Sequence, residues 1–194
     1  MEGERERHVD LFYASHFGHT ERIAIELARL ISAAGVQTQA RDLARDYPDA
    51  ERLATPAPCV LIGTIRYGYH LPLARRLLKQ IASLTPAKPL ILLSVNLTAR
   101  KEGKASAEGN VYLRKWIARS GAHPLLAEAI AGNLDYPRYN AFDRTAIRLI
   151  MSITGGPTDG TSVVDYTPWD RLPALAERIC TAIASASDRG TSRA

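Results

Sequence analysis

Apolar residues fall into two patterns that alternate along the chain. Continuous or alternating apolar runs predict strands over residues 9–14, 36–42, 59–63, 89–96 and 128–132. Between them, apolar residues recur at helical spacing and predict helices over residues 21–30, 73–81, 111–119, 142–153 and 168–185. Strands that alternate with helices are typical of a parallel sheet covered on both faces. We therefore expect a single α/β domain over residues 1–194, built on a doubly wound, five-stranded parallel sheet.

A loop rich in hydroxyl side chains follows the first predicted strand and suggests how the strands are ordered. An anion-binding loop at this place suits the strand order 2-1-3-4-5, in which ligands bind at the carboxyl ends of the strands. The loops after strands one, three and four then lie side by side at one edge of the sheet. These loops are residues 15–20, 64–70 and 94–100. We expect them to form one composite site.

The first of these loops has the features of a phosphate site. It joins a strand to a helix, where free backbone N–H groups and the helix dipole favour negative charge. Ser15 and Thr20 offer hydroxyl groups, and Gly18 permits a close approach of the backbone. The loop lacks the Gly-Lys-Ser/Thr ending of a nucleoside triphosphatase. We expect it to hold the phosphate of flavin mononucleotide (FMN) through Ser15, His16, Phe17, Gly18, His19 and Thr20.

The other two loops suit the rest of a flat, polar-edged cofactor. In the second loop Tyr67 and Tyr69 are able to stack on a ring system, and Gly68 allows the backbone to approach it. In the third loop Ser94 and Asn96 offer hydrogen bonds to ring or ribitol atoms. The cofactor-binding residues predicted here are Thr64, Ile65, Arg66, Tyr67, Gly68, Ser94, Val95, Asn96 and Leu97.

Composition adds a compartment and a charge pattern. The chain is 46% hydrophobic, and its two widely separated cysteines suggest neither a disulfide framework nor a metal site, so a reducing compartment is expected. The charged N-terminus has no apolar core of a secretory signal, and no apolar run is long enough to span a bilayer. The formal net charge is +5, and residues 100–153 alone carry nine Lys/Arg against five Asp/Glu. This segment is expected either to meet an anionic partner or to form a solvated basic surface.

Several motifs carry a resemblance to a known family. Residues 15–20 are similar to the Ser/Thr-x-x-Gly-x-Thr phosphate loop of the flavodoxins. More narrowly, residues 65–68, 94–101, 136–139 and 151–159 resemble the quinone-dependent, FMN-binding protoporphyrinogen IX dehydrogenases of bacteria. The resemblance covers about Val9 to Ile183. The chain departs from this family in its charged stretch Glu2 to Arg7 and in having His16, Phe17 and His19 in the phosphate loop.

The resemblance implies a flavodoxin-like fold, FMN as cofactor and an oxidoreductase that converts protoporphyrinogen IX to protoporphyrin IX in haem biosynthesis. It implies ubiquinone or menaquinone as electron acceptor and a peripheral position on the cytoplasmic side of the bacterial inner membrane. A homo-oligomer is compatible with it, and no nucleic acid or metal is expected. Two alternatives stay open: a flavodoxin-type electron carrier, which is usually acidic, and an FMN-dependent NAD(P)H:quinone reductase.

The late, basic part of the chain distinguishes it from a plain flavodoxin. Residues 136–157 are predicted to be an insertion in the domain. A charged extension is expected at residues 1–8 and a frayed tail at residues 187–194. One face of the predicted helix 142–153 is apolar and another carries Arg144 and Arg148, a pattern suited to a membrane interface, a substrate, the domain's own core or a second subunit. Arg66, Arg100, Lys101 and Arg138 are candidates for binding the propionates of the substrate. No catalytic residue is assigned, although His70 and His123 are candidate bases.

Overall fold

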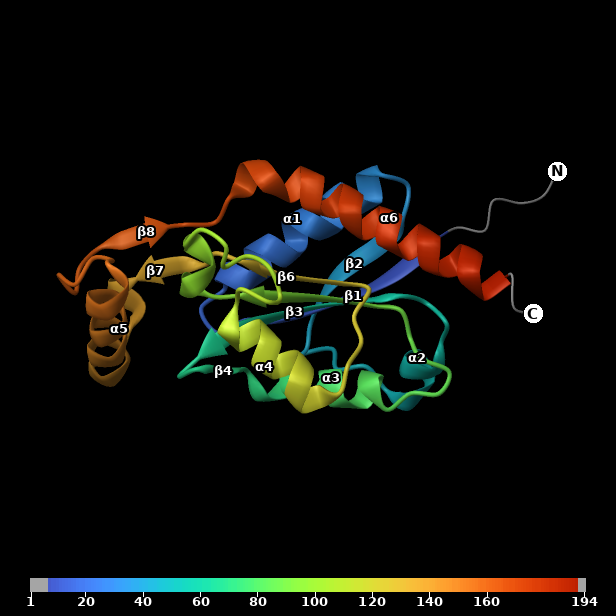
Figure 1. Ribbon diagram of the computed structural model, residues 1–194, viewed down its shortest axis with the longest axis horizontal. Coiled ribbons are helices and arrows are strands. Elements are labelled where there is room, and N and C mark those ends of the chain that lie inside the picture. The colour runs from blue at the N-terminus through green and yellow to red at the C-terminus, as the bar shows by residue number, and fades with distance from the viewer. Residues whose placement is uncertain (1–6, 192–194) are drawn as a thin grey trace.

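The computed structural model describes residues 7–191 and shows a three-layer α/β fold (Figure 1). The central sheet has the order β2-β1-β3-β5-β6, and neighbouring strands on this path are parallel. The strands are β1 (His8–Ala14), β2 (Gln37–Asp42), β3 (Cys59–Arg66), β4 (Tyr69–His70), β5 (Leu90–Val95), β6 (Leu126–Ile130), β7 (Asn133–Asp135) and β8 (Val163–Asp165). The helices are α1 (His19–Ala33), α2 (Ala50–Ala54), α3 (Pro72–Ala82), α4 (Val111–Ser120), α5 (Ala141–Thr154) and α6 (Leu172–Thr191). Counting only the long parallel strands, this is the predicted order 2-1-3-4-5, and the predicted fold class is confirmed.

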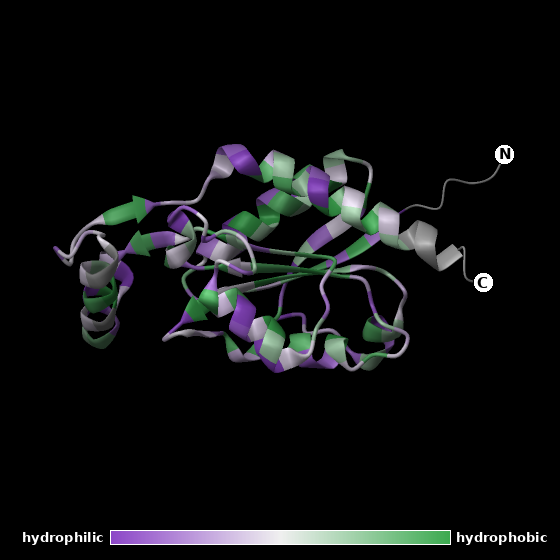
Figure 2. Cartoon of the chain, in the orientation of Figure 1, coloured by the Kyte–Doolittle hydropathy of each residue, from purple (hydrophilic) through white to green (hydrophobic). Residues whose placement is uncertain are grey.

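Side chains alternate between two hydrophobic layers along each central strand. In β1, Leu11 and Tyr13 pack on the face covered by α1 and α6, and Phe12 packs on the face covered by α3 and α4. Burial on both faces explains why β3 and β5 are apolar almost throughout, and Figure 2 shows the strands as a hydrophobic seam between amphipathic helices. This packing fixes the carboxyl ends of the strands relative to one another, which is what positions the site.

The structure contains elements that hydrophobic periodicity does not reveal. β4 is a two-residue strand that pairs antiparallel with the end of β3, α2 is a helix of five residues, and short 3₁₀ helices lie at Leu97–Arg100, Tyr136–Arg138 and Trp169–Arg171. The last strand of the main sheet is Leu126–Ile130 rather than 128–132, because Ala131 and Gly132 already leave the sheet. α6 continues to Thr191, past the expected end near Ser185, whereas residues 1–6 of the predicted extension and 192–194 of the predicted tail lie outside the described residues.

The segment after β6 forms an arm beyond the end of the main sheet (Figure 1). It runs from β7 to β8, which pair antiparallel, and carries α5 between them. A small core of Leu134, Tyr136 and Met151 holds the arm together, and the hydroxyl of Tyr136 donates to the Pro157 carbonyl at 2.7 Å. The excursion from the sheet is thus Asn133–Asp165, wider than the residues 136–157 expected. None of the described helices is long and apolar enough to cross a membrane.

Candidate cofactor and substrate site

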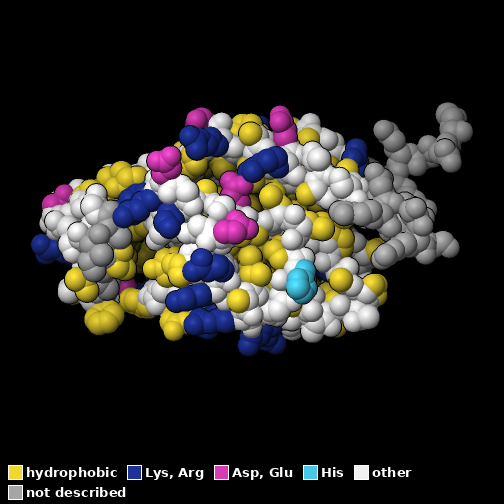
Figure 3. Space-filling model, in the orientation of Figure 1, with side chains coloured by type: hydrophobic (Ala, Val, Ile, Leu, Met, Phe, Trp, Pro, Cys, Tyr) yellow, Lys and Arg dark blue, Asp and Glu magenta, His cyan; other side chains and the backbone are white. Residues whose placement is uncertain are grey.

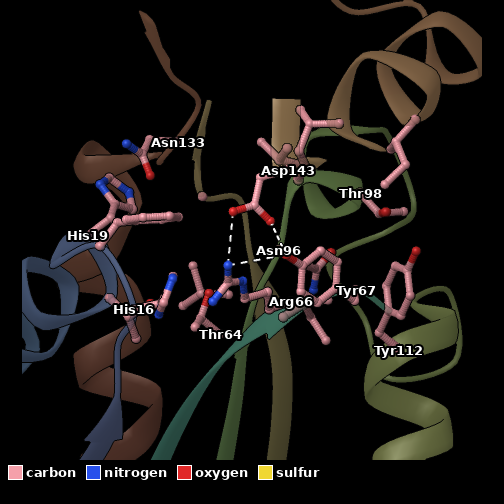
Figure 4. Close-up of a pocket in the computed structure, with 18 of the residues that line it drawn as sticks. His16, His19, Thr64, Arg66, Tyr67, Asn96, Thr98, Tyr112, Asn133 and Asp143 are labelled. Carbon is pink, nitrogen blue, oxygen red and sulfur yellow. Dashed lines mark hydrogen bonds and ion pairs between the residues drawn. The ribbon is translucent and has the colours of Figure 1, made fainter. Parts of the chain in front are cut away.

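A cavity of about 310 Å³ lies at the carboxyl ends of β1, β3, β5 and β6, and α5 contributes Asp143, Ile147 and Ile150 to its wall. The three expected loops meet here and contribute Ser15, His16, Phe17, His19, Thr20, Thr64, Ile65, Arg66, Tyr67, Gly68, Val95, Asn96 and Leu97 to its wall. Figure 4 shows His16, Thr64, Arg66, Tyr67 and Asn96 around this space. The site is therefore composite, as the strand order predicts.

The first loop forms an anion cradle at the start of α1. Gly18 is the N-cap and has a φ of 82°, and its amide donates to the Ser15 Oγ at 3.0 Å. α1 begins at His19, so the amides of its first turn have no partner inside the helix. Together with the helix dipole these amides suit a phosphate, although Gly18 itself does not line the cavity.

The pKa values of the two histidines of this loop are both lowered. Burial, and then the nearby guanidinium of Arg66, lower the pKa of His16. Burial also lowers the pKa of His19, in spite of the carboxylate of Asp165. His19 is fixed by Thr167, whose hydroxyl lies 2.7 Å from the His19 Nε2 and donates to the Ala131 carbonyl at 2.9 Å. A lowered pKa disfavours the charged imidazolium, so the open amides and the helix dipole are the main source of positive potential for a phosphate at this loop.

A latch made of Arg66, Tyr67 and Asp143 joins the second loop to α5. The Arg66 Nη2 lies 2.9 Å from one oxygen of Asp143, and the Tyr67 hydroxyl donates a short hydrogen bond to the other, as the dashed lines of Figure 4 show. Burial opposes ionisation of Asp143, but these two hydrogen bonds prevail and its pKa is lowered. Arg66 lines the cavity, and its Nε is buried without a hydrogen-bond partner among the described residues. It is a donor that a bound molecule is able to satisfy.

Ser94 is placed differently from the prediction. Its side chain is fully buried and does not line the cavity. Instead its Oγ lies 2.8 Å from the His70 Nε2 and accepts a hydrogen bond from the Asn96 amide at 3.0 Å. Asn96 in turn accepts from the amide of Asn110, which caps α4. Ser94 therefore positions Asn96 and the third loop rather than contacting a ligand.

Tyr69 and most of the predicted propionate-binding residues also lie outside the cavity. Tyr69 faces a second hollow between α3 and α4. Arg100 donates to the Leu97 carbonyl and stacks over Tyr166, and Lys101 is exposed. Arg138 donates to the Phe17 carbonyl at 2.6 Å, which ties the arm to the phosphate loop. Of the four candidate arginines and lysines, only Arg66 lines the cavity.

Neither candidate base is positioned for chemistry in this cavity. His70 is buried, and its ring stacks on Trp116 with 3.7 Å between centroids. Burial, and then the charge of Arg75, lower the pKa of His70 to about 3. His123 is exposed and lies in the loop before β6, whereas the cavity is at the other end of that strand. Both roles are thus unsupported by the geometry.

Part of the cavity wall comes from residues that sequence reasoning missed. They are Thr98, Tyr112, Gly132, Asn133, Tyr139, Asp143, Ile147 and Ile150. Gly132 and Asn133 follow the last strand of the main sheet, so the carboxyl-end rule would have found them if applied to a fourth loop. Thr98 lies in the third loop, next to the predicted Leu97, and the remaining residues belong to α4 and to the arm, where no local signal marks them.

Gly63 permits the packing beneath the second loop, and this leads to a stability prediction. A Cβ at this position would lie 2.7 Å from the Trp116 ring and 3.2 Å from the His70 ring. Gly63→Ala is expected to lower the free energy of unfolding by about 1–3 kcal/mol, because both rings are packed and cannot retreat freely. Urea unfolding followed by circular dichroism measures this loss. In a Trp116→Leu background the cost should shrink, and an undiminished cost would contradict the explanation.

The fold and cavity agree with what the chain is similar to. A flavodoxin domain family matches residues 11–161. Protoporphyrinogen IX dehydrogenase (quinone) of Leishmania major is 40% identical over 168 residues, which span 86% of this chain and 71% of that protein. The Escherichia coli K12 protein of the same name is 34% identical over 171 residues, which span 87% of this chain and 92% of that protein.

Solved structures resemble the fold at low identity. The rubredoxin oxygen:oxidoreductase of Desulfovibrio gigas superposes with a TM-score of 0.54 at 15% identity, covering 92% of this chain and 36% of that longer one. The flavodoxin of Streptococcus pneumoniae TIGR4 gives 0.50 at 14% identity, covering 90% and 98%. With the matching domain and the two relatives, the conclusion is that this chain belongs to the flavodoxin-domain family, among the protoporphyrinogen IX dehydrogenases (quinone).

Proposed function

We propose that this protein is an FMN-dependent oxidoreductase that converts protoporphyrinogen IX to protoporphyrin IX and passes the electrons to a quinone. The proposal rests on identity of 34–40% to enzymes of that name over most of the chain, matched to a cavity that α5 partly covers. A simple electron carrier has no need of such an added helix beside its cofactor. The positive net charge also differs from the acidic surface usual in such carriers.

The residues of the cavity fit FMN. The Ser15–Thr20 loop has the open amides and hydroxyls that a phosphate requires, and the unpartnered Nε of Arg66 is a donor for an acceptor on the cofactor. Gly68 and the backbone after β5 approach the cavity closely enough to border a flat ring. When bound, FMN supplies a two-electron acceptor for the substrate and a donor for the quinone.

The protein's own contribution is to hold the loops of the site in place and to enclose the cavity. Asn96, fixed by Ser94 and Asn110, gives the third loop one defined shape. The latch of Arg66, Tyr67 and Asp143 fastens α5, whose Ile147 and Ile150 add apolar wall to the cavity. An apolar wall suits a macrocycle whose body is hydrophobic, and it excludes water from the reacting atoms.

An anaerobic assay tests this function. Purified, FMN-loaded protein is mixed with protoporphyrinogen IX and a quinone, and porphyrin fluorescence is followed. We expect a rise that depends on the quinone and on the protein. No such rise, together with rapid flavin reduction by NADH or NADPH, would instead identify a nicotinamide:quinone reductase.

We further propose that the protein works at the inner face of the plasma membrane, with α5 in contact with the lipid. Phe142 and Leu149 are 72% and 63% exposed on this helix, and Arg144 and Arg148 are exposed on it as well. An exposed apolar edge with neighbouring cations suits an anionic bilayer surface.

Liposome flotation tests the membrane contact. Phe142→Asp with Leu149→Asp should abolish flotation with anionic vesicles while leaving the fold intact, because both side chains already face solvent. Ile150 is unsuitable for this test, since it also lines the cavity. Ile25→Asp, on α1 and 55% exposed, is the matched control and should float normally. Full flotation of the folded double variant would refute the contact.

A further inference from the structure

A second cavity, of about 480 Å³, lies in a groove between α3 and α4. Its floor is the stacked pair of His70 and Trp116, and Tyr69 and Tyr112 belong to its walls. The groove lies at the surface rather than in the core, because the cationic side chains that line it from the two helices are exposed.

The groove is strongly and uniformly basic. Its lining includes Arg75, Arg76 and Lys79 from α3 with Lys115 and Arg119 from α4, and contains no Asp or Glu. In the part of the chain that the structure describes, none of these five side chains takes part in an ion pair. Figure 3 shows Lys and Arg side chains gathered over this part of the surface. Like charges held together without counter-charges favour a ligand with more than one negative group.

Two of the arginines are already oriented. The guanidinium groups of Arg75 and Arg119 lie 5.8 and 5.4 Å from the centre of the Tyr69 ring. One comes from each helix, so both cations contact the same ring. A guanidinium that is positioned in advance loses less freedom when it binds a carboxylate.

The groove and the cofactor cavity are neighbours. Gly68 and Tyr112 line both of them, so a single ligand is able to reach from one to the other. Inside the cofactor cavity the charge of Arg66 is balanced by Asp143. The groove therefore offers five cations, unpaired among the described residues, in a hollow that shares wall residues with the cavity.

We propose that the groove binds the two propionate groups of the tetrapyrrole substrate, with Arg75 and Arg119 as their main partners, while the macrocycle lies over Tyr112 toward the cofactor. This inference rests on the proposed function, since protoporphyrinogen IX carries two propionates on neighbouring rings and an otherwise apolar body. It moves the carboxylate site away from Arg66, Arg100, Lys101 and Arg138, which the sequence had suggested.

The test first removes the charges of Arg75 and Arg119 and then removes the charges of the two propionates of the substrate. Arg75→Gln with Arg119→Gln should raise the KM for protoporphyrinogen IX roughly 10- to 100-fold and change kcat little. For the dimethyl ester of protoporphyrinogen IX, kcat/KM should be the same in the variant and the natural protein. The affinity of FMN-loaded protein for protoporphyrin IX, followed by porphyrin fluorescence, should fall by a similar factor. Arg45→Gln with Arg171→Gln changes the net charge equally at exposed positions outside the groove and should alter none of these values.

The outcomes separate this inference from the proposed function. An active natural protein whose groove variant discriminates acid from ester as before would overturn the groove and leave the function standing. A natural protein that is inactive but binds protoporphyrin IX through Arg75 and Arg119 would overturn the function and support the groove. Loss of binding to NADPH or to phosphatidylglycerol vesicles, with porphyrin affinity unchanged, would assign the groove to another anion and refute the proposal.

Discussion

Gly18→Ala is expected to weaken FMN binding at least about tenfold, because the loop that cradles the phosphate depends on a left-handed residue at this position. Gly18 has a φ of 82° and is the N-cap of α1, so its conformation decides how the first amides of the helix are presented. An alanine in this conformation is strained by about 1–2 kcal/mol, and the loop relieves the strain by changing shape. Fluorescence quenching of FMN by the apoprotein measures the affinity.

Gly35→Ala is the matched control. Gly35 follows the other end of α1, has a φ of 80°, and a Cβ there would meet nothing within 4 Å. It does not line the cavity. Both substitutions should therefore lower the free energy of unfolding by similar amounts, but only Gly18→Ala should affect FMN. Equal affinities in the two variants would show that the loop conformation is not what holds the phosphate.

The parts of the fold that burial dictates were predictable. Strands such as β3 and β5 pack on both faces, so their sequences are apolar for a length that only a buried strand requires. β7 and β8 are short and partly exposed, and they pair with each other although they lie far apart in the sequence. Periodicity has nothing to detect in three residues, and this is why the arm was expected to be smaller than it is.

The site shows the same division between local and distant causes. The loops at 15–20, 64–70 and 94–100 were predicted to meet because parallel topology alone places them together. Topology does not determine the direction in which a single side chain points. Ser94 and Tyr69 stand at the right edge of the sheet, but Ser94 points into a buried polar network and Tyr69 toward the groove. Their neighbours in space decide this, and those neighbours come from β4, from the third loop and from α3 and α4.

The charge pattern along the sequence indicated only part of the basic groove. Counting along the chain indicated residues 100–153 as the basic segment. The groove takes Lys115 and Arg119 from that segment, but its other cations come from α3, in a part of the chain with little net charge. A count of charges along the sequence does not reveal a cluster whose residues come from two separate helices. Arg100 and Arg138, proposed from motifs, lie outside the cavity because they bond to the backbone carbonyls of Leu97 and Phe17.

Asp143→Ala is expected to speed the dissociation of FMN by about tenfold or more, because it releases α5 from the second loop. The carboxylate accepts from Arg66 and Tyr67, and it is buried with 7% of its side chain exposed. Its loss leaves the partly buried guanidinium of Arg66 without a counter-charge. Stopped-flow release of FMN and hydrogen exchange of the α5 amides measure the effect. Asp170→Ala removes the same charge at an exposed position and should change neither.

Two further tests address whether the three residues of the latch act together and whether the charge of Asp143 is what holds α5. Tyr67→Phe removes only the hydroxyl donor, so in an Asp143→Ala background it should add almost nothing to the dissociation rate, and fully additive effects would argue against the latch. The pKa of Asp143 is lowered in the folded protein, so its contribution is fully present above the ordinary carboxyl range and is lost as the pH falls below that range. Between about pH 6 and 8 the ratio of the two dissociation rates, variant over natural protein, should therefore stay constant. A ratio that changed within this window would mean that a group other than Asp143, such as a histidine, governs the opening of α5.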